Sequence, residues 1–362
     1  MPTRTDLSRF TPKLITCLRD GYRPRDLLAD LGAGASVTII AMPLAMALGI
    51  ASIPQSVAEQ MIQIHPWLTP PAVGLFTVVV AGLLISLFGG SRVQIGGPTA
   101  AFIPIVFGVA SAHGFIGLTT ATLMAGLFLI LMGLFRFGAM IKFIPYPVTT
   151  GFMTGIAVTI FASQLKDFLG LSITSPQGEP LPLPVEFIPR LQLLGANLHT
   201  INWHATGVGL GSLAVLLVMR RLLPRVPGAI VAVVLSSAFV ALMGWASRDA
   251  AIDAEHARPV IETIGSRFGG IPRTLPSPHL PPLSFELIRD LLPSALTIAV
   301  LCAVESLLSA VVADGMTGYR HRSDQELVAQ GVANMGSALF FGLPATGAIA
   351  RTAANIKNGG RT

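Results

Sequence analysis

The segment "GLPATGAIARTAANI", residues 342–356, places a glycine–proline start and a single arginine, Arg351, at the end of a long apolar chain. A second segment with a similar start, "GGPTAAF", covers residues 96–102. The apolar run after each start is short for a helix that crosses a bilayer, which takes about 20 apolar residues. Both segments are therefore predicted to be half-helices that begin in the middle of a membrane.

The composition is that of an integral membrane protein. The chain has 362 residues, of which 52% are hydrophobic and 12% charged, and its mean hydropathy is +0.69. Soluble domains are nearer a quarter charged. The net charge of +6 comes mostly from basic residues between apolar stretches, where they set topology, so no nucleic-acid partner is expected. The two cysteines form no disulfide or metal motif, and no cofactor is expected.

Hydropathy predicts ten membrane segments. They lie at about 30–51, 72–89, 98–112, 115–135, 147–166, 205–222, 227–246, 287–313, 325–341 and from Pro344 onward. Lys and Arg cluster in residues 1–29 and in every second connection, which predicts a multi-pass protein of the cell (inner) membrane with a cytoplasmic N-terminus. The first apolar stretch begins too late, and after too polar a start, for a signal peptide.

The order of these segments indicates an inverted repeat. "RDLL" occurs at residues 25–28 and again at 289–292, and each copy is followed by two spans and a short proline-started segment. Seven spans separate the copies, so the second copy is inverted in the membrane. Broken helices at matching positions of an inverted repeat are typical of the central site of a transporter.

The two half-helix starts favour an anion site. A helix that begins inside the bilayer leaves its first N–H groups without partners, and its positive dipole end attracts an anion. Small residues let a ligand reach the backbone, and threonines add hydroxyl donors. The predicted anion-binding residues are Thr99, Ala100, Ala101, Thr346, Gly347, Ala348 and Arg351. Pro98 and Pro344 are expected in the first helical turns, so Arg351 is predicted about 10 Å along its helix; snorkelling is the alternative for Arg351.

Glu305 is the only carboxylate well inside a predicted span. It is predicted to accept a proton, or to bind a sodium ion with Ser306, Ser309 and backbone oxygens. A structural pairing, for example with Arg351, remains the alternative. No nucleophile–base pair or metal cluster is visible, so an enzyme is not expected.

Four stretches carry a resemblance to a known family. "GGSRVQIGGPTAAF" (89–102), "AVESLLSAVVADGMTG" (303–318), "DQELVAQGVANMGSALFFGLPATGAIARTAANI" (324–356) and the first span with its proline resemble the sulfate permease family, whose relatives include the solute carrier 26 anion exchangers. The resemblance implies an all-α polytopic membrane protein, with fourteen segments in an inverted 7+7 repeat, divided into core and gate domains. It implies that two half-helices meet at mid-membrane around the anion, with Arg351 behind it and Glu305 coupling a cation.

By the family pattern, about ten segments are present. The expected organisation is a cytoplasmic N-terminal segment at 1–29, a first seven-segment repeat at 30–246, an extracytoplasmic loop at 247–284 and the start of a second repeat at 285–362. The last four segments and the cytoplasmic STAS domain are expected to be missing, as in a fragment or a truncated product.

The function expected from these features is secondary active transport of an inorganic anion by an elevator mechanism. Sulfate is the first candidate for the anion, and H⁺ is the first candidate for the coupling ion. Na⁺-coupled bicarbonate transport and C4-dicarboxylate transport are the alternatives within the transporter class. Alternatives outside that class are an anion channel, a motor and a non-functional remnant. The partners expected are the anion, H⁺ or Na⁺, the lipid bilayer and, as an open option, a second copy of the chain.

Overall fold

The computed structural model describes residues 8–139, 146–174, 181, 183–184, 186–223, 228–246, 260–265 and 277–362. Two compact units divide the chain: residues 1–150 together with 272–362 form one, and residues 151–271 form the other. Among the described residues, five helices are long and apolar enough to cross a membrane. The predicted all-α polytopic membrane class is therefore confirmed.

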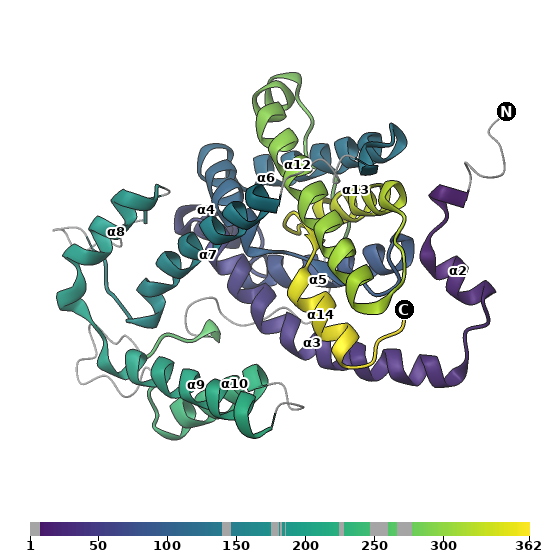
Figure 1. The fold of residues 1–362 in the computed structure, drawn as a ribbon. Helices are drawn as coiled ribbons and strands as arrows, with labels where there is room; N and C mark the ends of the chain where they lie inside the picture. Colours follow the sequence, from purple (N-terminus) through teal and green to yellow (C-terminus); the bar gives the residue numbers. More distant parts are fainter. Residues whose placement is uncertain are drawn as a thin grey trace. The chain divides into compact units, whose positions relative to one another are not determined.

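Five long helices build the first unit (Figure 1). They are α3 (Pro24–Ser52), α5 (Pro70–Phe88), α6 (Ile103–Leu134), α12 (Phe285–Thr317) and α13 (Ser323–Leu339). Helix α6 packs against both α12 and α13, while α5 packs against α3 and α13. Segments from the two ends of the sequence thus lie side by side in one helical unit.

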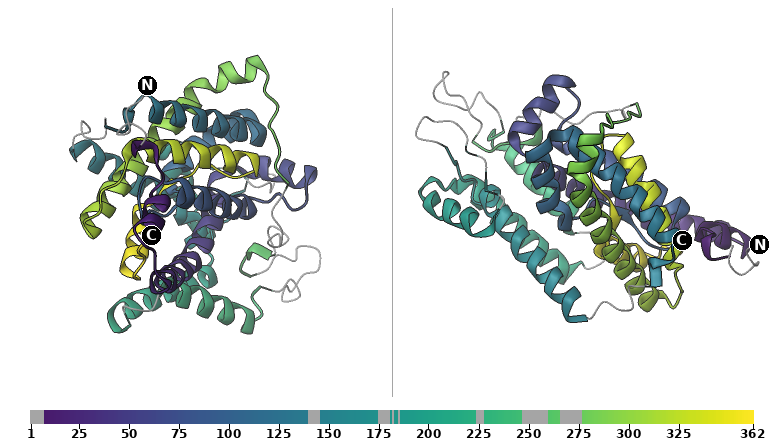
Figure 2. Two further views of the ribbon diagram at one scale, coloured as in Figure 1. Left: turned by 90° about the vertical axis from the view of Figure 1, so that its right-hand side faces the viewer. Right: turned by 90° about the horizontal axis from the view of Figure 1, so that it is seen from above.

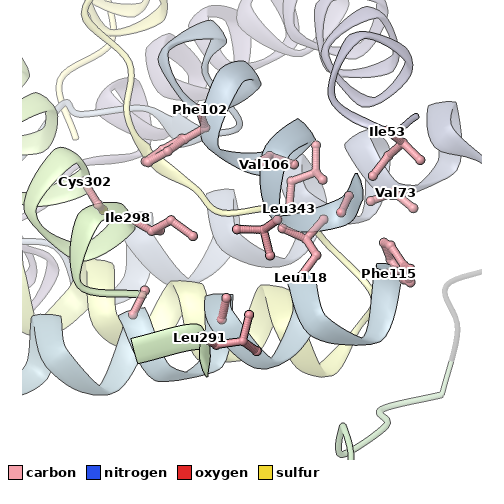
Figure 3. Packing of buried hydrophobic residues seen from close by; sticks show 14 of the residues in the cluster. Ile53, Val73, Phe102, Val106, Phe115, Leu118, Leu291, Ile298, Cys302 and Leu343 are labelled. Atoms are coloured by element: carbon pink, nitrogen blue, oxygen red, sulfur yellow. The ribbon is translucent and has the colours of Figure 1, made fainter. Parts of the chain in front are cut away.

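Buried apolar side chains of α5, α6, α12 and the short helix α4 (Gln55–Ile64), together with Leu327 of α13, form the main core, part of which is shown in Figure 3. Leu118 of α6 and Leu291 of α12 are both fully buried. The outer faces of α5, α6 and α12 stay apolar; Leu127 of α6, for example, is 50% exposed. Apolar residues both inside and outside are what a helix bundle in lipid requires, because the bilayer replaces water at its surface.

The third and fourth predicted spans form one interrupted helix. A short 3₁₀ turn, η2 (Ala100–Phe102), leads into α6, and Gly114 breaks α6 with a non-helical conformation at φ +67°. Glycine tolerates this left-handed backbone at little cost. The predicted spans at 98–112 and 115–135 therefore match the two arms of α6.

Two short strands, absent from the sequence-based expectations, join the predicted half-helices. Strand β1 (Gly96–Gly97) pairs antiparallel with β2 (Thr346–Gly347), with Gly96 opposite Gly347 and Gly97 opposite Thr346. Helix α14 (Ile349–Lys357) follows β2 directly. The strands satisfy backbone groups in the unwound stretch, which would otherwise be costly inside a membrane.

The predicted positions of two prolines were wrong. Pro98 and Pro344 lie before the helices rather than in their first turns, and Pro104 takes the first-turn position of α6. As a consequence Arg351 is the third residue of α14 and sits in its first turn. The estimate of 10 Å along the helix is therefore too long, because it counted from Pro344.

The second unit contains α8 (Phe187–Ala196), α9 (Trp203–Leu222) and α10 (Gly228–Leu242). Helix α7 (Tyr146–Phe168) lies mostly in this unit, and α9 packs against α10 (Figure 2). Asn202 caps α9 by accepting hydrogen bonds from the N–H groups of His204 and Ala205. Much of the loop predicted at 247–284 lies outside the described residues.

Hydropathy did not predict three shorter helices. These are α2 (Lys13–Arg19) and α4 (Gln55–Ile64) of the first unit and α8 of the second. Each has 10 residues or fewer, too short to appear as a membrane span.

Candidate anion site

Two helix starts are brought together by the β1–β2 pair. Thr99 precedes η2 and Ala348 precedes α14, and neither start has a side-chain cap. The first N–H groups of a helix have no intrahelical partner. With no capping side chain present, these donors, together with the helix dipole, are suited to an anion.

Backbone pairing fixes the distance between the two starts. Beyond the strand residues, the Ala348 N–H donates to the Ile95 carbonyl at 2.8 Å. Asn334 of α13 binds the backbone of Ala345, the residue just before β2. Its Nδ2 donates to the Ala345 carbonyl at 2.8 Å, and its Oδ1 accepts from the Ala345 N–H at 2.9 Å. The Asn334 amide thus completes the backbone hydrogen bonding of the stretch that leads into β2.

Arg351 connects one helix start to the other. Its side chain is 4% exposed, and one guanidinium nitrogen donates to the Pro98 carbonyl at 2.6 Å. Its Nε is buried with no hydrogen-bond partner in the described part of the chain. The guanidinium is thus held inside the protein by bonding, which argues against snorkelling, and one of its donors is left for a ligand.

The close approach of Arg351 depends on Gly97. A β-carbon built on Gly97 would lie 2.6 Å from a terminal nitrogen of Arg351, well inside van der Waals contact. Any side chain at position 97 would therefore displace the guanidinium from its place beside β1. Gly97 therefore has a specific role that the sequence pattern alone did not reveal.

Glu305 of α12 contacts the first helix start. Thr99 Oγ1 donates to Glu305 Oε2 at 2.8 Å, and Glu305 is 6% exposed. No ion pair joins Glu305 to Arg351 in the part of the chain that the structure describes. The carboxylate is therefore held by a neutral hydroxyl, and the pairing with Arg351 that the sequence left open is not formed.

The Thr346 hydroxyl is directed at α12 and not at the space between the helix starts. It donates to the Cys302 carbonyl at 3.1 Å and contacts Ser306 Oγ at 2.6 Å. The Gly347 N–H also donates to Ser306 Oγ, at 3.0 Å. Because Thr99 is engaged with Glu305, backbone N–H groups and Arg351 are the free donors of the site, and the expected threonine donors are occupied.

The other predicted residues surround this network. Ala101 is buried and Ala348 is 9% exposed, while Ala100 is half-buried. Ser309 lies one turn beyond Glu305, fully buried, with its Oγ 3.3 Å from Thr352 Oγ1. The structure therefore gathers the predicted anion and cation residues around one β1–β2 pair.

Several residues at this site were not singled out by the sequence. Thr352 accepts from the Ile95 N–H at 3.0 Å, and Asn355 donates to the Val93 carbonyl at 3.0 Å. Gln94 donates to the Ser306 carbonyl at 3.0 Å. A signal was available for Thr352 and Asn355, which are polar residues in the short segment from Pro344 that hydropathy had already assigned to the membrane, whereas Gln94 lies between two predicted spans.

A second buried carboxylate, Glu326 of α13, anchors the chain that leads toward β1. Its Oε2 accepts from the N–H groups of Gly90 and Ser91, at 2.8 and 3.2 Å, and its Oε1 accepts from Gln330 at 2.8 Å. Glu326 is fully buried. It lies at the edge of the predicted span 325–341, which is why only Glu305 was expected to be buried.

These features define a class: a polytopic helical membrane protein whose two unwound helix starts face each other beside a buried arginine and a buried carboxylate. The chain belongs to the Sulfate permease family, whose sequence model matches residues 27–362. It is 44% identical over 94% of its length to the Bacillus subtilis protein named "Putative sulfate transporter YvdB", covering 57% of that protein. It is 32% identical over 93% of its length to the bicarbonate transporter BicA of Picosynechococcus, covering 55% of it.

Solved structures agree with this assignment. The transmembrane domain of a cyanobacterial BicA matches with a TM-score of 0.74 and 30% identity, over 94% of this chain and 79% of that one. Murine Slc26a9 in its inward-facing state matches with a TM-score of 0.78 over 100% of this chain and 58% of that one. At 18% identity, that second likeness shows the fold alone. The chain spans about half the length of the curated relatives it matches.

Proposed function

We propose that this chain forms the anion-binding part of a secondary active transporter that moves an inorganic oxyanion together with a cation. One observation carries the proposal: two uncapped helix starts, held together by β1–β2, share a buried Arg351 whose Nε has no partner among the described residues. Unpaired donors and a fixed positive charge in a membrane are costly unless a ligand satisfies them.

Sulfate is the first candidate for the anion. The donors that remain at the site are N–H groups, which bind any oxyanion and do not require it to carry a proton. The relative with 44% identity is named a sulfate transporter, which supports the same choice. Bicarbonate is the second candidate, supported by the likeness to BicA in sequence and structure.

Glu305 is proposed to hold the coupling cation. It is buried, it accepts a hydrogen bond only from a neutral side chain among the described residues, and it lies one residue from the Ser306 network. A negative charge next to an anion site is unfavourable unless it is neutralised, and because Arg351 forms no ion pair with Glu305 among the described residues, a bound cation is proposed to neutralise it. This requirement links the two ions and supports symport.

An elevator motion is proposed for the transport step. All the predicted site residues belong to one compact unit, residues 1–150 with 272–362. A site contained within a single unit can move as a whole, without the strand pair being broken. In this mechanism β1 and β2 stay paired throughout the cycle.

Uptake by proteoliposomes tests the proposal. The purified chain is reconstituted, and uptake of labelled sulfate, bicarbonate and succinate is followed under imposed H⁺ or Na⁺ gradients. Accumulation of sulfate above its external concentration is expected, and it must collapse when the cation gradient is removed. Flux that only follows the anion's own gradient would instead indicate a channel, and no flux of any anion would reject the proposal.

A further inference from the structure

Gln94 carries an unsatisfied oxygen in the middle of the candidate site. The residue is 5% exposed, and its Nε2 donates to the Ser306 carbonyl at 3.0 Å. Its Oε1 is buried with no hydrogen-bond partner among the described residues. Only three buried side-chain atoms of the described chain share that condition, and a second of them is Arg351 Nε at the same site.

The hydrogen bond to Ser306 fixes which end of the amide is free. A carbonyl oxygen accepts but cannot donate, so only the NH₂ end of Gln94 can face it. Exchanging the two ends would place two oxygens against each other. The free atom is therefore an amide oxygen, which accepts hydrogen bonds and binds hard cations.

The surroundings of Gln94 are rich in acceptors and poor in free donors. The Gly347 N–H, which lies next to the Gln94 side chain, already donates to Ser306 Oγ. Ser306 Oγ is in turn within 2.6 Å of Thr346 Oγ1, whose proton goes to the Cys302 carbonyl. An anion that carries no proton has nothing to donate to the Gln94 oxygen, whereas a cation would find a ligand there.

We propose that Gln94 Oε1 is a ligand of the coupling cation and that this cation is Na⁺. The inference rests on the proposed role of Glu305 in coupling. A proton on Glu305 leaves the Gln94 oxygen unsatisfied, because an amide oxygen is too weak a base to hold a proton of its own. Na⁺ takes several oxygen ligands at once, and unwound segments in transporters supply them. Gln94 thereby determines which cation drives transport.

Gly347 positions the Gln94 amide. A β-carbon built on Gly347 would lie 1.6 Å from Gln94 Nε2, so no other residue at 347 permits this placement. The amide is also fixed through Ser306, the residue after Glu305. The same stretch of α12 therefore orients both proposed cation ligands.

Cation binding without transport gives the first test. The purified chain is melted in sodium, potassium or choline gluconate at equal ionic strength, so that no candidate anion is present. A ligand that binds only the folded state raises the melting temperature, and the rise grows with the logarithm of the ligand concentration relative to its Kd. We expect a rise specific to Na⁺, and a titration that is at least about tenfold weaker in Gln94→Met, which removes the oxygen but keeps the length.

Two further variants make the outcome decisive. Gln55→Met is the matched control, since Gln55 is exposed on α4, and it should titrate like the unmodified chain. Gln94→Asn keeps both the amide oxygen and the NH₂ group, and we expect it to retain a Na⁺-specific rise even if Gln94→Met fails to fold. The absence of a Na⁺-specific rise in the unmodified chain, or an equal rise in Gln94→Met, overturns the proposal.

Uptake separates this inference from the proposed function. In Gln94→Met the Na⁺ concentration for half-maximal uptake should rise about tenfold, while the anion KM at saturating Na⁺ stays within about twofold. A changed bicarbonate KM with unchanged Na⁺ dependence would assign Gln94 to a protonated anion and refute the cation role. If the unmodified chain transports no anion, the proposed function fails, and the melting experiment still decides the Na⁺ site.

Discussion

Arg351 reaches across the site, from the first turn of α14 to the carbonyl of Pro98. Removing the guanidinium should therefore weaken anion binding while leaving the helices in place. We expect Arg351→Ala to lower sulfate affinity by roughly 10- to 100-fold, equivalent to about 1.4–2.8 kcal/mol. Isothermal titration or a competition assay measures it, with the exposed Arg320→Ala as control. Unchanged affinity in Arg351→Ala would remove the arginine from the site.

Glu305 supplies the negative charge of the proposed cation site. Glu305→Gln keeps a carbonyl oxygen that can accept the Thr99 hydrogen bond but loses the charge. We expect this variant to be expressed and to exchange anions, with uptake that no longer responds to an imposed cation gradient. Measuring uptake with and without the gradient checks it. A persisting response would make Glu305 a structural residue.

Adding one carbon at Gly97 should displace the side chain of Arg351, which is distant in sequence but adjacent in space. In Gly97→Ala the new β-carbon displaces the Arg351 guanidinium, which would otherwise lie 2.6 Å away. We expect a loss of anion affinity close to that of Arg351→Ala, about tenfold or more. The double variant should be no worse than either single one, because both remove the same interaction. Additive losses would contradict this coupling.

At the scale of residues, the sequence was most informative where residue type alone is unusual for a membrane. Glu305 and Arg351 could be selected because charge inside a span is rare. Gln94 and Asn334 could not, because an uncharged amide costs less and is a weaker signal. Their roles depend on which backbone groups they meet, and that is decided by the pairing of distant segments.

At the scale of elements, Arg322 attaches helix α2 to the rest of the first unit. The guanidinium of Arg322 donates to the Thr11 carbonyl at 2.6 Å and to Thr16 Oγ1 at 2.9 Å. Cys17 on α2 is buried, and burial raises the pKa of its thiol. At pH 8 the thiol is therefore mostly protonated and poorly reactive, because the thiolate is the nucleophile.

Detaching α2 should expose this thiol. We expect Arg322→Ala to return the pKa of Cys17 toward its ordinary value and to raise its alkylation rate at pH 8 several-fold. Peptide mass spectrometry with iodoacetamide follows Cys17 separately from Cys302, which stays buried on α12. Arg320→Ala serves as the control. Equal rates in both variants would show that other contacts hold α2.

Hydropathy predicted the boundaries of the long helices well and those of the half-helices poorly. The span predicted at 287–313 corresponds to α12, Phe285–Thr317, and the span at 72–89 to α5, Pro70–Phe88. The start predicted at Pro344 lies five residues before α14 begins at Ile349. The difference arises because β2 pairs with β1, 249 residues earlier in sequence by Gly97 and Thr346, and no local pattern encodes that pairing.

At the scale of the whole molecule, stability depends on the core and not on the apolar outer faces. Leu118 and Leu127 lie on the same helix, but Leu118 is fully buried and Leu127 is 50% exposed. We expect Leu118→Ala to lower the free energy of unfolding by about 2–5 kcal/mol, through lost contacts and a cavity. Leu127→Ala should have a much smaller effect in the same detergent. Thermal or chemical denaturation compares the two, and equal losses would place the core elsewhere.

The class and family of the molecule were predictable because they depend on composition and on long motifs. The organisation into two compact units was not, since residues 1–150 and 272–362 combine across an inserted stretch. Hydropathy marks where a chain enters the bilayer, but it does not say which spans pack together. That choice is made by close contacts such as those between α6 and α13.

The β1–β2 pair also sets an order of events during synthesis. Gly96 and Gly97 enter the membrane while the ribosome has yet to make their partners, Thr346 and Gly347. Until those residues emerge, the nascent segment between α5 and α6 has unpaired backbone groups that water, the translocon or a chaperone must shield. The binding site therefore cannot form until residues 346 and 347 have been made, and the strand pair then replaces that protection for the segment between α5 and α6.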